Sequence, residues 1–253
     1  DRNFATAGRS VYETEHAFKI ALTHDRELFA GLQSRFSLFG NITSGEPFSY
    51  TFDIDSRNAL FGRSGDGESP FDNDLLYVPT IAGGVISDSN VVVGSGFKEA
   101  AFVDFVERQG LASGIQDKNN GTSGWNQQWD FQWQQEIPFF NKQAEKFVGE
   151  NKLKFVLDIA NVANLLNSDW GTQSNGPGFD AVGNVRADLV SAADVAANGA
   201  DGATALERDA ARTTCASAGD CVYRFNSFRD RDVNFQSLSR SVYEVRVGLR
   251  YEF

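Results

Sequence analysis

The sequence predicts an all-β fold built from antiparallel strands, and two observations support this prediction. In five segments of the chain, apolar and polar residues alternate with a period of two, as they do in a strand that has one apolar and one polar face. The links between these segments are alternately short and long, which is typical of antiparallel strands joined at the two ends of one sheet. No run of about 18 apolar residues occurs, so we expect no transmembrane helix.

The clearest alternation lies in SVYEVRVGLRYEF, at residues 241–253. From Tyr243 onward the odd positions are apolar or aromatic, whereas the even positions are Glu, Arg or Gly. Alone, such a strand also suits a soluble sandwich. About twelve residues at about 3.3 Å each, tilted by about 40°, rise by about 30 Å, which spans the apolar band of about 25 Å of an outer-membrane barrel. A slip of one residue would turn Arg246 and Arg250 toward lipid, at a cost of about 2 to 4 kcal/mol each.

The lengths of the links favour a membrane barrel over a sandwich. Short periplasmic turns and long extracellular loops alternate in such barrels, and if the last strand runs toward the periplasm, both long links lie outside. The predicted strands are 16–26, 32–54, 126–138, 150–162 and 242–253. The predicted extracellular loops are 1–15, 55–125 and 163–241.

The polar faces of these strands would line the barrel lumen. For any one of these residues, ordinary polarity of a lumen wall is a simpler explanation than substrate binding. The predicted lumen residues are Arg35, Gln128, Asp130, Gln132, Gln134, Glu136, Lys154, Asp158, Arg246 and Arg250.

Both long loops contain segments with helical character. In residues 95–110, the apolar residues Phe97, Ala101, Phe102, Phe105 and Val106 form one helical stripe, and Gly110 follows it. We therefore predict a short amphipathic helix in the first long loop. The second long loop contains an Ala-rich, low-complexity segment at 187–212 that is helical in part by composition.

The chain is acidic, with 34 Asp plus Glu against 23 Lys plus Arg, a formal charge of −11. This balance argues against nucleic-acid binding, which requires basic patches. Most acidic residues lie in the predicted loops, where they attract divalent cations or basic ligands, or simply keep the surface soluble. Three of them, Asp66, Asp72 and Asp74, are candidate Ca²⁺ ligands, but the spacing of an EF-hand is absent and acidic turn residues are the favoured interpretation. We expect no other cofactor.

Aromatic residues of the loops are candidates for ligand contact, namely Phe71, Tyr77 and Trp125. Enzymatic activity is not expected, because the chain has only two histidines, His16 and His24, and lacks a GxSxG motif.

The two cysteines, Cys215 and Cys221, predict a small surface disulfide in an oxidising compartment. A metal site would need more ligands, and a catalytic thiol would need a nearby His.

Several segments resemble a known family. FSLFGNITSGEPFSYTF, NDLLYVP, QWDFQWQQEIP and LDIANVANLLNSDWG, followed by VRVGLRYEF, resemble in this order the C-terminal region of Oar-like TonB-dependent outer-membrane receptors. The resemblance covers nearly the whole chain and is weakest at 81–96 and 172–222. NVANLLNSDWG is similar to a family segment near the end of the penultimate strand, and the cysteine pair resembles a small disulfide in the last extracellular loop of some members. The terminal Val247, Leu249, Tyr251 and Phe253 resemble the signal that the barrel-assembly machinery reads.

The resemblance implies a barrel of twenty-two strands, of which this chain would supply the last five. It also implies an N-terminal plug domain and a TonB box that couples transport to the inner-membrane proton gradient, and neither is visible here. Because the start DRNFATAGRS has neither Met nor a signal region, we expect it to be a processed or cleaved end.

The expected location is the Gram-negative outer membrane, with extracellular loops. The expected partners are the remaining N-terminal strands and plug, the TonB complex, the barrel-assembly machinery and outer-membrane lipid. The expected function is energy-coupled uptake of a ligand. The alternative is a surface docking, adhesion or assembly role that uses the long loops.

Overall fold

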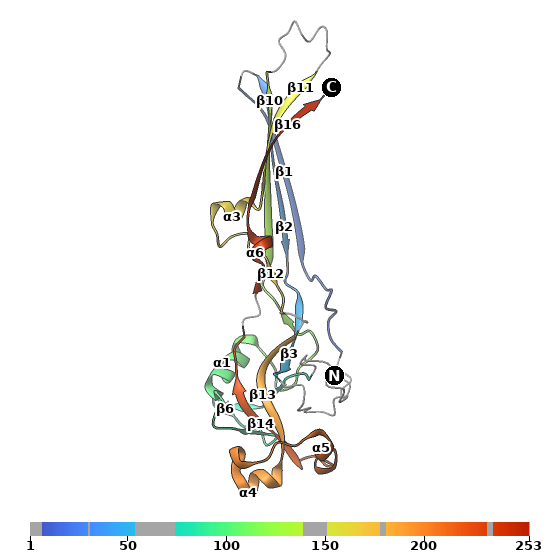
Figure 1. The fold of residues 1–253 in the computed structure, drawn as a ribbon, viewed down its shortest axis with the longest axis vertical. Coiled ribbons are helices and arrows are strands. Elements are labelled where there is room, and N and C mark those ends of the chain that lie inside the picture. Colours follow the sequence, from blue (N-terminus) through green and yellow to red (C-terminus); the bar gives the residue numbers. More distant parts are fainter. Residues whose placement is uncertain are drawn as a thin grey trace. The chain divides into compact units, whose positions relative to one another are not determined.

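The computed structural model describes residues 7–29, 31–53, 74–138, 151–177, 181–231 and 235–252. The chain is predominantly β and divides into two compact units (Figure 1). Residues 14–45, 124–175 and 234–253 form what we call the strand unit. Residues 1–13, 46–123 and 176–233 form what we call the insert unit, which consists largely of the segments predicted as extracellular loops.

The strand unit contains a five-stranded sheet in the order β1-β2-β10-β11-β16, in which every adjacent pair is antiparallel. The antiparallel arrangement predicted from the alternation is therefore confirmed. Figure 1 shows these strands side by side. Their bounds are Ala17–Leu28 for β1, Leu32–Thr43 for β2, Asn126–Ile137 for β10, Lys152–Ala160 for β11 and Glu244–Glu252 for β16.

The prediction that the two alternating stretches of 32–54, on either side of TSGEP, belong to one strand is wrong. β2 ends at Thr43, and a separate strand β3 (Pro47–Phe52) pairs in parallel with β13 (Ala181–Ser191) in the insert unit. The register pairs of β2 end at Thr43, and Pro47, which has no backbone N–H, begins the new strand. All six residues of β3 are buried, so its alternation does not mark one apolar and one polar face.

The main sheet of the insert unit has the order β7-β14-β13-β3-β9, with β7 at Val91–Val93, β14 at Cys221–Phe228 and β9 at Gly121–Thr122. β7 pairs with β14 in parallel, as β3 does with β13, whereas β13 with β14 and β3 with β9 are antiparallel. The described residues contain three further short antiparallel pairs. In the insert unit β4 (Tyr77–Val78) pairs with β8 (Gly114–Ile115), and β5 (Ile81–Ala82) pairs with β6 (Val85–Ile86). In the strand unit β12 (Ser174–Asn175) pairs with β15 (Phe235–Gln236).

The helix predicted in the first long loop is α1, at Glu99–Gln109, and it ends at Gly110 as expected. Its buried stripe differs from the prediction, because Phe97 precedes the helix and Ala101 is exposed, while Val103 is buried. Helices are not confined to that loop, and the other helices of the described residues are α3 (Val162–Leu166), α4 (Ala192–Gly202), α5 (Arg208–Thr214) and α6 (Leu238–Ser241). Among the described residues, no helix combines the length and the apolar character needed to cross a membrane.

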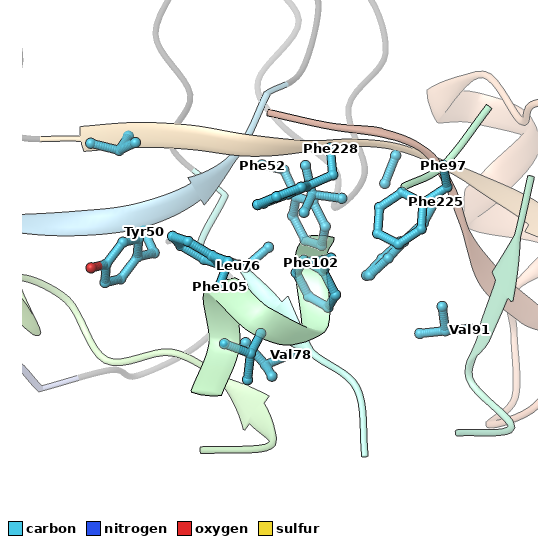
Figure 2. Packing of buried hydrophobic residues seen from close by; sticks show 14 of the residues in the cluster. Tyr50, Phe52, Leu76, Val78, Val91, Phe97, Phe102, Phe105, Phe225 and Phe228 are labelled. Carbon is cyan, nitrogen blue, oxygen red and sulfur yellow. The ribbon is translucent and has the colours of Figure 1, made fainter. Parts of the chain in front are cut away.

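The insert unit has a hydrophobic core of its own, in which α1 packs against the sheet (Figure 2). Phe102 contacts the ring of Phe225 edge-on at 5.9 Å and that of Phe228 at 5.5 Å. Phe105 lies 5.7 Å from Tyr50 on β3 and 5.3 Å from Phe228 on β14, measured between ring centroids. Aromatic pairs of this geometry contribute about 0.5 to 1.5 kcal/mol each beyond their burial. Three segments that are far apart in the sequence therefore share one core.

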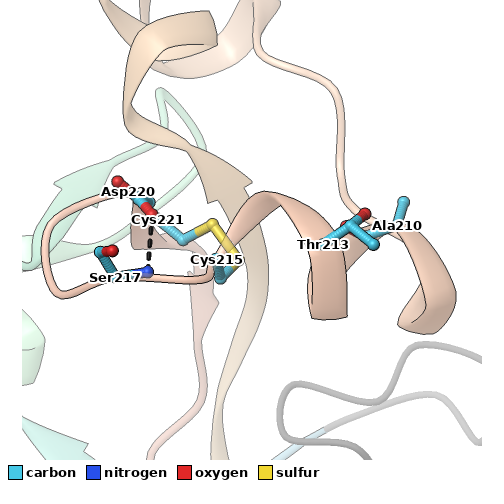
Figure 3. Close-up of a disulfide and its surroundings, with 6 residues drawn as sticks. All are labelled: Ala210, Thr213, Cys215, Ser217, Asp220 and Cys221. Carbon is cyan, nitrogen blue, oxygen red and sulfur yellow. Dashed lines mark hydrogen bonds between the residues drawn. A yellow bond between two sulfur atoms is a disulfide. The ribbon is translucent and has the colours of Figure 1, made fainter.

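The predicted disulfide between Cys215 and Cys221 is present (Figure 3). It joins the residue after α5 to the first residue of β14. Within the small ring that it closes, the backbone N–H of Ser217 donates to the carboxylate of Asp220 at 2.7 Å. The bridge thus fixes the link between α5 and the central sheet of the insert unit.

Candidate functional site

The strand register gives the sheet of the strand unit one apolar face. One row across all five strands consists of Leu22, Leu38, Phe131, Ile159 and Val245. The side chains of this face stay exposed on both edge strands, with Leu22 on β1 59% exposed and Leu249 on β16 70% exposed. A contiguous exposed face of large apolar side chains is typical of a surface that contacts lipid or another protein.

The opposite face is polar, and it carries all ten residues that were predicted to line a lumen. Gln132 is aligned with Asp158 and Arg246, and Glu136 with Lys154. Residues of the set that belong to the same strand are separated by an even number of positions, so they share one face. The complete set is Arg35, Gln128, Asp130, Gln132, Gln134, Glu136, Lys154, Asp158, Arg246 and Arg250.

Polar side chains of this face are linked across neighbouring strands. The guanidinium of Arg35 donates twice to the carboxylate of Asp25, at 2.7 and 2.9 Å. The amide of Gln132 donates to Asp158 at 2.6 Å, and the ammonium of Lys154 lies 2.7 Å from the carboxylate of Glu252. These bonds join β1 to β2, β10 to β11 and β11 to β16, so the charges are compensated within the sheet.

Asp130 connects the polar face to the turn that follows β11. Its Oδ1 accepts the backbone N–H of Asn161 at 2.9 Å and a bond from the amide of Gln128 at 3.2 Å. Gln128 in turn accepts a bond from the amide of Gln173 at 3.0 Å. The carboxylate of Asp130 is therefore held from one side in a fixed orientation.

A hollow of about 360 Å³ lies on this face over β1, β2 and β10. It contains an aromatic residue that the sequence analysis missed, Phe39, which is 52% exposed although its neighbours in the register are polar or small. The signal was present in FSLFGN, where Phe39 falls at the position of the polar residues Arg35 and Ser37 and not at that of Phe36. The hollow is lined by Lys19, Ile20, Ala21, Phe39, Gly40, Asn41, Gln128 and Asp130.

Trp125, a predicted ligand contact, belongs to the strand unit. It stacks on His16, with ring centroids 5.9 Å apart, and on Phe18 at 6.3 Å. Trp125 and Phe18 are each more than half exposed. The three rings form an exposed aromatic cluster at the end of β1.

Tyr77, expected as an exposed loop aromatic, is instead partly buried and packs against the core of the insert unit. Its ring stacks on that of Tyr223 at 5.2 Å, and its hydroxyl donates to Asp88 at 2.8 Å. Burial raises the pKa of Tyr77 and, more strongly, that of Tyr223. Burial alone would also raise the pKa of Asp88, but the bonds from Asn90, Tyr77 and Thr80 outweigh it and lower the pKa. Tyr77 therefore supports the fold of this unit.

Some of the remaining candidates lie outside the described residues, namely Phe71, Asp66, Asp72 and Phe253. Asp74, the third Ca²⁺ candidate, is buried at 6% exposure. In the described ranges, no group of three or more His, Cys, Asp or Glu is placed to hold a metal ion. Of the terminal signal, Val247, Leu249 and Tyr251 lie on the apolar face of β16 and are largely exposed.

The acidic charge is concentrated in the insert unit. Its three segments contain 23 Asp plus Glu against 13 Lys plus Arg, whereas the strand unit contains 11 against 10. The formal charges are thus −10 and −1, in agreement with the expectation that the acids lie in the predicted loops. A nearly neutral strand unit suits a sheet in which several charges are paired across or along the strands.

The fold and this site define a class of protein, one with an open antiparallel sheet that has an apolar and a charged face and is joined to a folded, acidic insert. Comparison with protein-family models, curated proteins and solved structures finds no match to this chain.

Proposed function

We propose that this chain forms the last five strands of a TonB-dependent outer-membrane transporter and takes part in energy-coupled uptake of a ligand. The observation that carries this proposal is the pair of faces of the strand unit, an exposed apolar face opposite a charged and hydrogen-bonded one. In an outer-membrane barrel the first face contacts lipid and the second lines the lumen. The two faces alone support an outer-membrane barrel of any kind. The segments that resemble Oar-like receptors are the reason to propose a TonB-dependent transporter in particular.

The two edges of the sheet support a larger assembly. Among the described strands, β1 pairs only with β2 and β16 only with β11. Unpaired backbone N–H and C=O groups cost several kcal/mol each in a bilayer, so an open five-stranded sheet is not stable there. Further strands of the same receptor would complete the barrel, up to the twenty-two that the resemblance implies. A plug and a TonB-contacting segment would belong to that N-terminal part.

The insert unit favours a second function, the docking of another surface protein. In place of plain loops, the long links form a compact unit with a buried aromatic core and a disulfide. A folded, acidic surface unit of this kind suits adhesion or assembly as well as ligand capture. In either case the unit would face the outside of the cell.

Assembly in the membrane is tested with the native protein from outer-membrane fractions. A barrel migrates differently on gels before and after heating, and native mass spectrometry in detergent gives the mass of the folded species. We expect heat-modifiable migration and a mass well above the 27.8 kDa of this chain. A stable folded species of 27.8 kDa alone would contradict the proposal.

A strain that lacks the gene for this protein distinguishes the transport proposal from the docking proposal. Loss of uptake of one nutrient, abolished also by dissipating the proton gradient, supports the transporter. Unchanged uptake of every tested nutrient together with lost surface attachment supports docking instead.

A further inference from the structure

The hollow on the polar face of the strand unit spans two adjacent rows of the register. One row contains Lys19, Asn41 and Gln128, and the next contains Ala21, Phe39 and Asp130. Its volume of about 360 Å³ falls within the range of small-molecule sites, and it suits a ligand about the size of one monosaccharide.

Phe39 is the apolar part of this hollow. Its ring is half exposed on a face where the other strands carry amides, carboxylates and cations. Its partner on β1 is Ala21, whose single methyl group covers little of the ring. An exposed aromatic ring among polar groups offers a flat surface on which the C–H face of a ligand can lie.

The polar groups around Phe39 differ in charge. Asp130 is an acceptor that Asn161 and Gln128 hold in place, with lone pairs left for further donors. Lys19 and the amide of Asn41 are exposed and directly opposite each other on β1 and β2. One cation, one amide and one fixed carboxylate therefore surround one aromatic ring.

We propose that this hollow is a binding subsite for an acidic monosaccharide, a pyranose that carries a carboxylate. The C–H face of the sugar lies on Phe39, its hydroxyl groups bond to Asp130 and Asn41, and its carboxylate pairs with Lys19. A neutral sugar of the same shape would lose only the charge-assisted contact. The inference rests on the proposed transporter function and specifies the class of its ligand.

Binding is tested on the native protein in detergent, with D-glucuronate and D-galacturonate as probes and D-glucose as the neutral counterpart. Saturation-transfer NMR detects contact, and calorimetric titration gives the affinity. Lys19→Gln is expected to weaken uronate binding about tenfold and to leave glucose binding within about twofold, since one charge-assisted bond is lost. Phe39→Ala is expected to weaken both ligands to a similar degree.

Lys152→Gln is the matched control, because Lys152 is an exposed lysine of the same face outside the hollow. An equal loss of uronate affinity in Lys19→Gln and Lys152→Gln would show attraction to general positive charge and would overturn the proposal. Absence of saturation transfer from either uronate at millimolar concentration would overturn it too. A third outcome would also overturn the proposal. If the parent binds no uronate and Phe39→Ala loses heat-modifiable assembly, Phe39 packs against another part of the barrel and does not bind a ligand.

The two proposals fail separately. A protein that is heat-modifiable in outer membranes but binds no uronate leaves the transporter proposal intact and removes the subsite. A protein that never shows heat-modifiable assembly removes the transporter proposal, whatever its sugar binding.

Discussion

The side chain of Asn161 joins the turn at Gly171 to the end of α6 in the strand unit. Its Nδ2 donates to the carbonyl oxygen of Gly171 at 2.9 Å and to that of Ser241 at 2.6 Å, and Asn161 is almost fully buried. Asn161 adopts the left-handed conformation, with φ of 52°, which Asn tolerates better than most residues. Gly171 also has a positive φ, and a Cβ there would lie 2.0 Å from Oδ1 of Asn161. The two residues therefore depend on each other.

We expect Asn161→Ala to destabilise the strand unit by about 1 to 3 kcal/mol, because two buried carbonyl groups lose their donor. The temperature at which the native protein loses its unheated gel mobility measures this change. Asn164→Ala is the matched control, since the amide of Asn164 donates to the carbonyls of Ser168 and Trp170 at an exposed site. Equal shifts in the two variants would show that Asn161 has no special role in joining the two segments.

Trp129 lies directly over Gly40, its partner in the register. A Cβ at Gly40 would be 2.5 Å from Cζ3 of the indole, so Gly40→Ala forces the ring to move. We expect a cost of about 1 to 3 kcal/mol in denaturant unfolding, and a smaller cost of the same change in a Trp129→Ala background. Gly248→Ala is the control, because no atom lies within 4 Å of its added Cβ. A Gly40→Ala change without effect, or one of equal size in both backgrounds, would contradict the contact.

Alternation in the sequence predicts strands well where the two faces of a sheet meet different surroundings. β10 and β16 are of this kind, and their bounds are close to the predicted ones. β3 and β13 are mostly buried inside the insert unit, so the two faces of these strands do not meet different surroundings, and the alternation in β3 is misleading. Their parallel pairing joins segments more than 120 residues apart, and local patterns do not encode such a choice.

The partial helicity expected from composition is confirmed for one further segment, but composition does not show where the helices begin. The Ala-rich region 187–212 was expected to be helical in part, and it contains α4 and most of α5, which ends at Thr214. Its first five residues nevertheless belong to β13, where Ala187 and Val190 are buried in the insert unit. Tertiary packing therefore overrides the helical preference of Ala at this point.

The candidate site was predictable to the extent that it follows the register. Because side chains alternate across a strand, position alone places Gln132, Asp158 and Arg246 on one face, once the strands are aligned. Phe39 was missed because it directly follows Leu38, so both positions of the period of two are apolar at this point. Only its odd position, shared with Arg35 and Ser37, places Phe39 on the polar face. Packing of Tyr77 against Tyr223 depends on a contact between distant segments, which the sequence alone does not reveal.

The disulfide is expected to stabilise the insert unit through the entropy of the unfolded chain. Replacing Cys215 and Cys221 together by Ser opens a ring of about seven residues, which predicts a loss of about 2 kcal/mol. Thermal unfolding, followed by fluorescence with and without a reductant, measures the change. Reductant should lower the melting temperature of the parent protein and leave that of the double variant unchanged. Reactivity of both cysteines in a free-thiol assay of the native protein would contradict the bridge.

Protonation of Asp88 is expected to weaken the insert unit at low pH. The bonds that Asn90, Tyr77 and Thr80 donate to Asp88 outweigh the effect of burial and lower its pKa in the folded state. A carboxyl whose pKa is lower when folded stabilises the protein above its unfolded pKa of 3.8, and that contribution is lost as the pH falls through the folded value. The parent should therefore be more stable than Asp88→Asn at pH 6, and the difference should shrink below pH of about 3.8. Denaturant unfolding of both proteins from pH 6 to 3 measures this, and because all other carboxyls are common to the two, a difference that is constant with pH would contradict the role of Asp88.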